Sequence, residues 1–211
     1  MTRREFIGSG TAAGLWALSG CRTTGTDGVP FAALGRPSHA SPNYWCTWCS
    51  QGAMFASGVL ADRSRRPKGG NTTRDGIDEI TAFGKGGFAS FFPESRSELM
   101  LVFDDGWDVP YGAQPQDRRE FAAMFPHPQR FPSFKGTPVE RLCELASRTR
   151  DAGWRGLGLW TCIQAQGAYG HPDWKGLSAE EEWKRKFEWF AKAGVSYLKV
   201  DWGDHSGDVA F

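Results

Sequence analysis

The chain has 211 residues, and its 25 lysines and arginines nearly cancel its 24 aspartates and glutamates. This balance excludes a general electrostatic attraction to nucleic acid or to an anionic membrane surface, so we expect an uncharged partner. The ten tryptophans suit a sugar, because an indole offers both an apolar ring and one N–H donor, although most tryptophans of a folded chain belong to its core.

The chain opens with a twin-arginine pair, Arg3 and Arg4, followed by an apolar segment over residues 7–18. That segment is shorter than the roughly 20 residues of a transmembrane helix, so it predicts a twin-arginine export signal. Cys21 closes a Leu-Ser-Gly-Cys lipobox, which predicts cleavage of residues 1–21 and a lipid on the Cys21 thiol. The protein would then be lipid-anchored in the periplasm or at the cell surface. An ordinary signal with an incidental cysteine is the alternative.

Residues 22–41 are rich in Gly, Thr, Ser and Pro and have no apolar periodicity. This composition predicts a flexible tether. The folded part is therefore expected to span residues 42–211.

An aromatic-rich segment, residues 44–51, predicts the first strand and contains a C-x-x-C pair, Cys46 and Cys49. On a strand these two thiols would face opposite sides. One such pair is weak evidence for zinc or redox chemistry, so structural or free cysteines are favoured and a redox or metal module remains the alternative. The pairing of Cys143 and Cys162 is not predicted.

The next elements are a helix expected over residues 74–83, with Ile77 and Ile80 on one face, and a strand over 99–103. The strand is a continuous apolar run, which is typical of burial on both faces of a parallel sheet. Residues 108–136 have low periodicity and form a long connection, which is typical of functional loops.

Two capping boxes predict the remaining helices. The boxes are formed by Thr137 with Glu140 and by Ser178 with Glu181. We expect the helices to end at Gly153 and Gly194, since glycine favours the left-handed conformation that closes a helix. Apolar strands over 156–160 and 195–200 follow them.

The order βαβαβαβ predicts an α/β fold with a parallel sheet, either doubly wound or closed into a barrel. No glycine-rich phosphate-binding motif follows any strand, which excludes the commonest nucleotide-binding folds. Polar and aromatic residues collect at the carboxyl ends of the strands, the end that carries the active site of an α/β barrel. They are Trp48, Gln51, Asp104, Asp105, Gln164, Lys199 and Asp201.

Lys199 and Asp201 lie two residues apart, so on a strand they project to the same side. An adjacent lysine favours the ionised carboxylate that a retaining glycosidase needs as its nucleophile. Asp104 and Asp105 offer acceptors for sugar hydroxyls. Spacing alone does not distinguish these roles from a structural ion pair and from a turn closed by Gly106.

At these positions the chain resembles the α-galactosidase (melibiase) superfamily, glycoside hydrolase families 27 and 36, over about residues 43–203. Four segments carry the resemblance in register: Trp45-x-x-Trp48, Asp104-Asp105-Gly106-Trp107, Phe131-Pro132 with the later Gly158-Leu159-Trp160, and Lys199-Val200-Asp201. The resemblance implies a (β/α)8 TIM barrel that hydrolyses terminal α-galactosyl or related α-linked sugars with retention, without a metal or organic cofactor.

The resemblance also implies roles for individual residues. Asp201 would be the nucleophile. The residues that would bind the sugar are Trp48, Asp104, Asp105, Trp160 and Lys199. Gly203 and Gly106 replace cysteines of family 27, and Trp160 replaces a tyrosine, so the sugar specificity is not predicted.

The acid/base aspartate of these families lies on the sixth strand, whereas the present sequence stops at Phe211, just past the fourth. We therefore expect about the first four β/α units of a barrel, from a longer reading frame, without turnover of their own. Turnover of a nitrophenyl α-galactoside that Asp201→Ala abolishes would contradict this expectation. A surface lipoprotein that binds glycans without cleaving them is the alternative function.

Overall fold

The computed structural model describes residues 42–56, 73–114, 121–162 and 177–201. The export signal, Cys21, the tether, Gln164 and Gly203 lie outside these ranges. The strands are β1 (Tyr44–Cys46), β2 (Met100–Phe103), β3 (Gly156–Thr161) and β4 (Val195–Val200). The α-helices are α1 (Trp48–Ala56), α2 (Glu79–Phe83), α3 (Pro138–Asp151) and α4 (Ala179–Ala193), and the 3₁₀ turns are η3 (Arg74–Gly76), η4 (Phe88–Ser90) and η5 (Arg96–Glu98). Among these helices none is long and apolar enough to cross a membrane.

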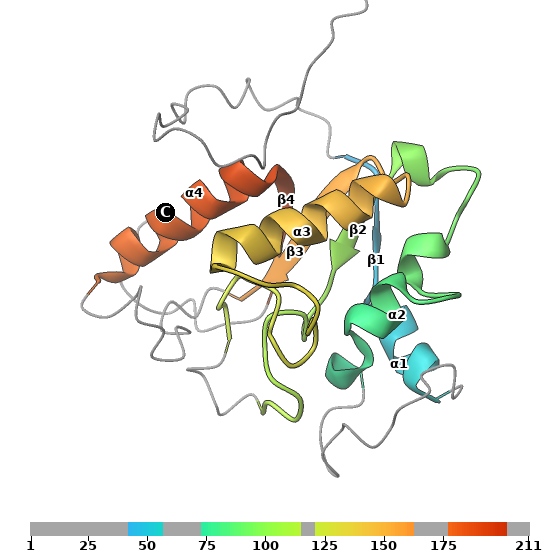
Figure 1. Ribbon diagram of the computed structural model, residues 1–211, viewed down its shortest axis with the longest axis horizontal. Helices are drawn as coiled ribbons and strands as arrows, with labels where there is room; N and C mark the ends of the chain where they lie inside the picture. Colours follow the sequence, from blue (N-terminus) through green and yellow to red (C-terminus); the bar gives the residue numbers. More distant parts are fainter. Residues whose placement is uncertain (1–41, 57–72, 115–120, 163–176, 202–211) are drawn as a thin grey trace, which may run out of the picture.

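The four strands form one parallel sheet in the order β1-β2-β3-β4, so each strand pairs with the next along the chain. The predicted α/β class with a parallel sheet is confirmed. Helices α3 and α4 pack against each other and lie side by side over one face of the sheet (Figure 1). The buried core lies beneath them.

The two faces of the sheet differ in character. Leu101 and Phe103 of β2 and Leu157 and Leu159 of β3 belong to the core under the helices. Residues that alternate with them point to the opposite face, because side chains of a strand alternate between its two sides. This second face, which we call the concave face, includes residues that the strand register places side by side: Tyr44, Cys46, Met100, Val102, Gly158, Trp160, Tyr197 and Lys199.

The name reflects the curvature of the sheet. The rings of Tyr44 and Tyr197 stack with their centroids 5.0 Å apart, although β1 and β4 are separated by two strands. Neighbouring strands lie about 4.8 Å apart, so in a flat sheet β1 and β4 would be about 14 Å apart and parallel side chains would not meet. The sheet therefore curves around this face. A Cβ atom on Gly158 would lie 2.8 Å from Val102 and 3.0 Å from Tyr197, so only glycine fits between them.

The predicted strand over residues 44–51 is wrong beyond Cys46. Thr47 makes the last contact with the sheet, through its N–H to the Val102 carbonyl, and its own carbonyl then accepts the N–H of Gln51. The chain thus turns directly from β1 into α1. The C-x-x-C pair does not share a strand, because Cys46 ends β1 while Cys49 is exposed in the first turn of α1.

The single helix expected over residues 74–83 is also corrected. The Asp78 side chain accepts the N–H of Thr81 and starts α2 there, as a capping box, so the preceding residues form the separate turn η3. As a result Ile77 is buried, whereas Ile80 is 50% exposed, and the two do not share an apolar face.

Both predicted capping boxes are present, at Thr137 for α3 and at Ser178 for α4. Gly194 ends α4 in the left-handed conformation, with a φ of 75°. The described parts of residues 108–136 contain no helix or strand. Buried Arg141 holds part of this connection by donating to the carbonyls of Pro126, Phe131 and Phe134.

Candidate functional site

The sheet brings three of the predicted site residues together. Lys199, on β4, places its ammonium 2.7 Å from Asp104 Oδ2 at the end of β2 and 3.8 Å from Asp201 Oδ2 at the end of β4. The Asp201 N–H donates to the Thr161 carbonyl and so extends the pairing of β3 with β4. Because β2 and β4 are not neighbours, the contact between Lys199 and Asp104 depends on the curvature of the sheet.

Asp201 combines a fixed oxygen with access to solvent. Its Oδ2 accepts the indole N–H of Trp160 at 3.0 Å, while 48% of its side chain is exposed. Trp160 itself is fully buried. The buried indole therefore orients the carboxylate, and the single N–H donor of Trp160 is already used in this contact.

The charge of Lys199 is stabilised by its neighbours. Partial burial on its own would lower the pKa of the ammonium, but the hydrogen bond and attraction of Asp104, with smaller contributions from Cys46 and Asp201, outweigh it and raise the pKa. Lys199 is thus a cation placed between two carboxylates. Such an arrangement can hold both carboxylates as hydrogen-bond acceptors.

Asp104 is almost completely buried, and three donors point at its carboxylate. The Asp105 N–H reaches Oδ1 at 2.8 Å, and Lys199 reaches Oδ2 at 2.7 Å. The third donor is the thiol of Cys46, 2.7 Å from Oδ2. Burial and the bond to Asp104 raise the pKa of this thiol to about 12, so the thiol stays protonated.

The sequence presents Cys46 only as half of a C-x-x-C pair. No local spacing could have found it, because its contacts join residues 58 and 153 positions apart.

Asp105 lies next to the site with its carboxylate directed away from it. Arg74 Nε lies 2.9 Å from each of the Asp105 oxygens, and Arg74 Nη2 lies 2.8 Å from Oδ2. Burial raises the pKa of Asp105 against the opposing effect of Arg74. A role for Asp105 in binding sugar hydroxyls stays a prediction, and in this conformation Arg74 occupies both oxygens.

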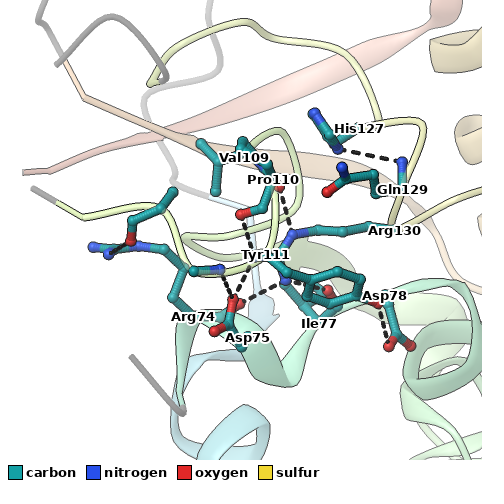
Figure 2. Close-up of polar contacts among 12 residues, drawn as sticks. Arg74, Asp75, Ile77, Asp78, Val109, Pro110, Tyr111, His127, Gln129 and Arg130 are labelled. Carbon is teal, nitrogen blue, oxygen red and sulfur yellow. Dashed lines mark hydrogen bonds and ion pairs between the residues drawn. The ribbon is translucent and has the colours of Figure 1, made fainter. Parts of the chain in front are cut away.

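The segment that carries Arg74 is held in turn by a buried arginine, Arg130, whose contacts Figure 2 shows. Arg130 donates to Asp75 and to the carbonyls of Arg74, Ile77, Val109 and Pro110. These five bonds use all five donors of its guanidinium. Its charged group also lies 4.4 Å from the centre of the Tyr111 ring. Arg130 thereby fixes η3, and with it Arg74, relative to the loop that follows β2.

Trp48 and Gln51, which the sequence placed at the end of the first strand, lie instead in α1. Trp48 is half-buried as the first residue of α1. Gln51 is buried and donates to the carbonyls of Thr73 and Asp105 at 3.0 Å each. Thr47 accepts the Asp104 N–H on its hydroxyl, so α1 holds the turn that presents Asp104.

Within the described ranges, no three or more His, Cys, Asp or Glu side chains are grouped so that they could hold a metal ion. Comparisons with models of known protein families, with characterised proteins and with solved structures find no match for this chain.

Proposed function

We propose that this chain carries the nucleophile and part of the sugar pocket of a retaining glycoside hydrolase acting on terminal α-galactosyl or related α-linked residues. The observation that carries the proposal is the setting of Asp201, whose exposed carboxylate is held by Trp160 and lies beside Lys199. A nucleophile of this class must be ionised, fixed and open to the anomeric carbon. The Trp160 hydrogen bond and the 48% exposure of the side chain support the last two requirements, and the Lys199 ammonium lies 3.8 Å from the carboxylate.

A (β/α)8 barrel is the architecture that we propose for the complete fold. Doubly wound sheets have helices on both faces and a strand order that reverses at a switch point. In the described part of this chain, the strands follow one another in sequence order and α3 and α4 cover the same face. The curvature of the sheet is a further feature that favours part of a barrel. The concave face would then line the interior of that barrel.

In the proposed mechanism, Asp201 attacks the anomeric carbon, the bond to the leaving oxygen breaks, and a covalent glycosyl ester forms on the carboxylate. Lys199 directs two of its three N–H groups to Asp104 and Cys46 and offers the third to a sugar hydroxyl. Asp104 acts mainly on Lys199, since three of about four acceptor positions on its carboxylate are already occupied. No described residue is assigned as the general acid.

A glycosyl fluoride tests the nucleophile without a general acid, because fluoride leaves without protonation. We expect α-galactosyl fluoride to give a single glycosyl adduct on the peptide that contains Asp201, detected by mass spectrometry of the denatured, digested chain. Asp201→Asn should give no adduct. Asp151→Asn, at the exposed end of α3, is the matched control and should react like the unchanged chain.

The same experiment separates the two candidate functions. A glycan-binding protein without catalysis would bind galactose in calorimetry but would form no adduct with the fluoride. It would use the same hydrogen-bonding groups, Lys199 and the half-exposed Asp201. An adduct on a carboxylate other than Asp201 would contradict the assignment of the nucleophile.

A further inference from the structure

The thiol of Cys46 lies in the middle of the charged groups of the site, although no catalytic step uses it. It is 2.7 Å from Asp104 Oδ2 and 3.8 Å from the Lys199 ammonium. Cys46 comes from β1, Asp104 follows β2 and Lys199 belongs to β4, so the three side chains meet across the concave face. We call these three residues the thiol triad.

We propose that Cys46 is a positioning residue whose protonated thiol fixes Asp104 Oδ2 against Lys199 and also accepts an N–H of Lys199 on its sulfur, and that it thereby sets the direction in which Lys199 presents its third N–H to a sugar hydroxyl. The part of the inference that concerns the sugar rests on the proposed function. The contact between the thiol and the carboxylate rests only on the geometry of the triad.

The first argument is the number of donors on one oxygen. A carboxylate oxygen offers two lone pairs, and Oδ2 of Asp104 receives the thiol and the ammonium. Oδ1 is held by the Asp105 N–H. With the thiol in place, rotation of the carboxylate would break at least one of these three bonds, which restricts the position of the ammonium.

The second argument concerns the state of the thiol. A thiolate beside Asp104 would place two anions in contact inside the fold, which is unfavourable. The ionisable groups that face Cys46 are Asp104 from β2, Lys199 from β4, and Tyr44 and Tyr197 across the concave face. Burial and Asp104 oppose ionisation of the thiol, whereas Lys199 favours it and has the smaller effect.

Alkylation of the full chain with iodoacetamide tests the geometry, because only the thiolate reacts. We expect Cys46 to react at least about tenfold more slowly than exposed Cys49 at pH 8, since each unit of pKa changes the thiolate fraction tenfold. Asp104→Asn has the same shape and should accelerate Cys46 by about tenfold or more, while Lys199→Met should not accelerate it.

Equal rates for Cys46 and Cys49 in the unchanged chain would overturn the contact between thiol and carboxylate. This comparison is made within one folded molecule, so it holds even if Asp104→Asn does not fold. An unchanged rate for Cys46 in a folded Asp104→Asn chain would also overturn it, because slow reaction would then reflect burial alone.

Binding of galactose, measured by calorimetry, tests the positioning role. We expect Cys46→Ala to weaken binding about three- to tenfold and Cys46→Ser to stay within about twofold of the unchanged chain, because a hydroxyl also donates to Asp104. Cys49→Ala is the control and should have no effect. Equal affinities for Cys46→Ala and the unchanged chain would overturn the role. If the unchanged chain binds no galactose, the proposed function fails instead, and the alkylation rates still decide the contact.

Discussion

Gly106 occupies a position in the turn after Asp104 and Asp105 where a side chain has no room. Its φ is +115°, and a Cβ atom would lie 2.1 Å from the carbonyl oxygen of Arg74. The close approach lets η3 pack against the turn, which brings Arg74 to Asp105. In the sequence the glycine indicated only a turn; the contact that requires it comes from a segment some thirty residues earlier.

Gly106→Ala should therefore lower the free energy of unfolding by more than the conformational cost alone. Gly86 is the matched control, because it also has a positive φ, of +76°, but its Cβ would meet nothing within 4 Å. We expect Gly86→Ala to cost about 1 kcal/mol and Gly106→Ala at least about 2 kcal/mol more, measured by urea denaturation. Similar costs for the two variants would contradict the clash.

Asp108 links stability to pH, because burial raises the pKa of its carboxyl from 3.8 to about 7. Asp105 raises it further, while the Met124 N–H and Lys186 oppose the shift. Between pH 3.8 and about pH 7, the folded chain therefore keeps a proton on Asp108 that the unfolded chain has already lost. This contribution to stability is therefore complete below pH 4 and is lost as the pH rises through 7.

Asp108→Asn should remove this dependence, since an amide does not titrate but can still accept the Met124 N–H. We expect the variant to gain at least about 1 kcal/mol relative to the unchanged chain on going from pH 5 to pH 8, in urea denaturation at both values. Parallel pH curves for the two chains would show that Asp108 keeps an ordinary pKa.

At the scale of single elements, the helices over the sheet begin where local chemistry starts them. The Thr137 and Ser178 hydroxyls accept the N–H groups of Glu140 and Glu181, and each glutamate in turn accepts from its cap residue. These bonds lie within four residues, so the sequence alone predicted both helix starts. The start of α1 was not predicted. It depends on the end of β1, which is set by the last bond of the Thr47 N–H to the Val102 carbonyl of β2, a contact between distant segments.

The capping glutamates predict a loss of stability in acid. Hydrogen bonds from Thr137 and Ser178 lower the pKa values of Glu140 and Glu181. Their stabilisation is therefore complete above the ordinary pKa of glutamate and is lost as the pH falls through the lowered values. We expect the variant Glu140→Gln with Glu181→Gln to be less stable than the unchanged chain at pH 7, and the difference to shrink on acidification. Glu180→Gln, in the same first turn of α4 but outside the box, is the control for the loss of a charge and should cost less stability at pH 7 than the double variant.

At the scale of the whole molecule, the curvature of the sheet assembles the candidate site. It brings Lys199 of β4 to Asp104 after β2, and Tyr197 of β4 to Tyr44 of β1. The stacked tyrosines therefore report the curvature directly.

A double-mutant cycle on Tyr44→Ala and Tyr197→Ala should give a coupling free energy of about 0.5–1.5 kcal/mol, as stacked aromatic pairs do. Tyr44→Ala combined with Phe187→Ala, on the exposed side of α4, is the control and should be additive. Additive behaviour of the tyrosine pair would mean that the sheet is flatter than the structure shows.

The sequence by itself determined the α/β class, three of the four strands to within about a residue, both capped helices and the position of Lys199 two residues before Asp201. These features depend on periodicity and on bonds between near neighbours, which a linear pattern contains. Only the tertiary structure decided that Trp160 orients Asp201, that Arg74 engages Asp105, and that the Cys46 thiol lies between Asp104 and Lys199. Those contacts join residues from about 30 to more than 150 positions apart. They follow from the pairing of parallel strands, from the curvature of the sheet and, for Arg74, from the packing of η3 against the turn after β2, none of which a local spacing specifies.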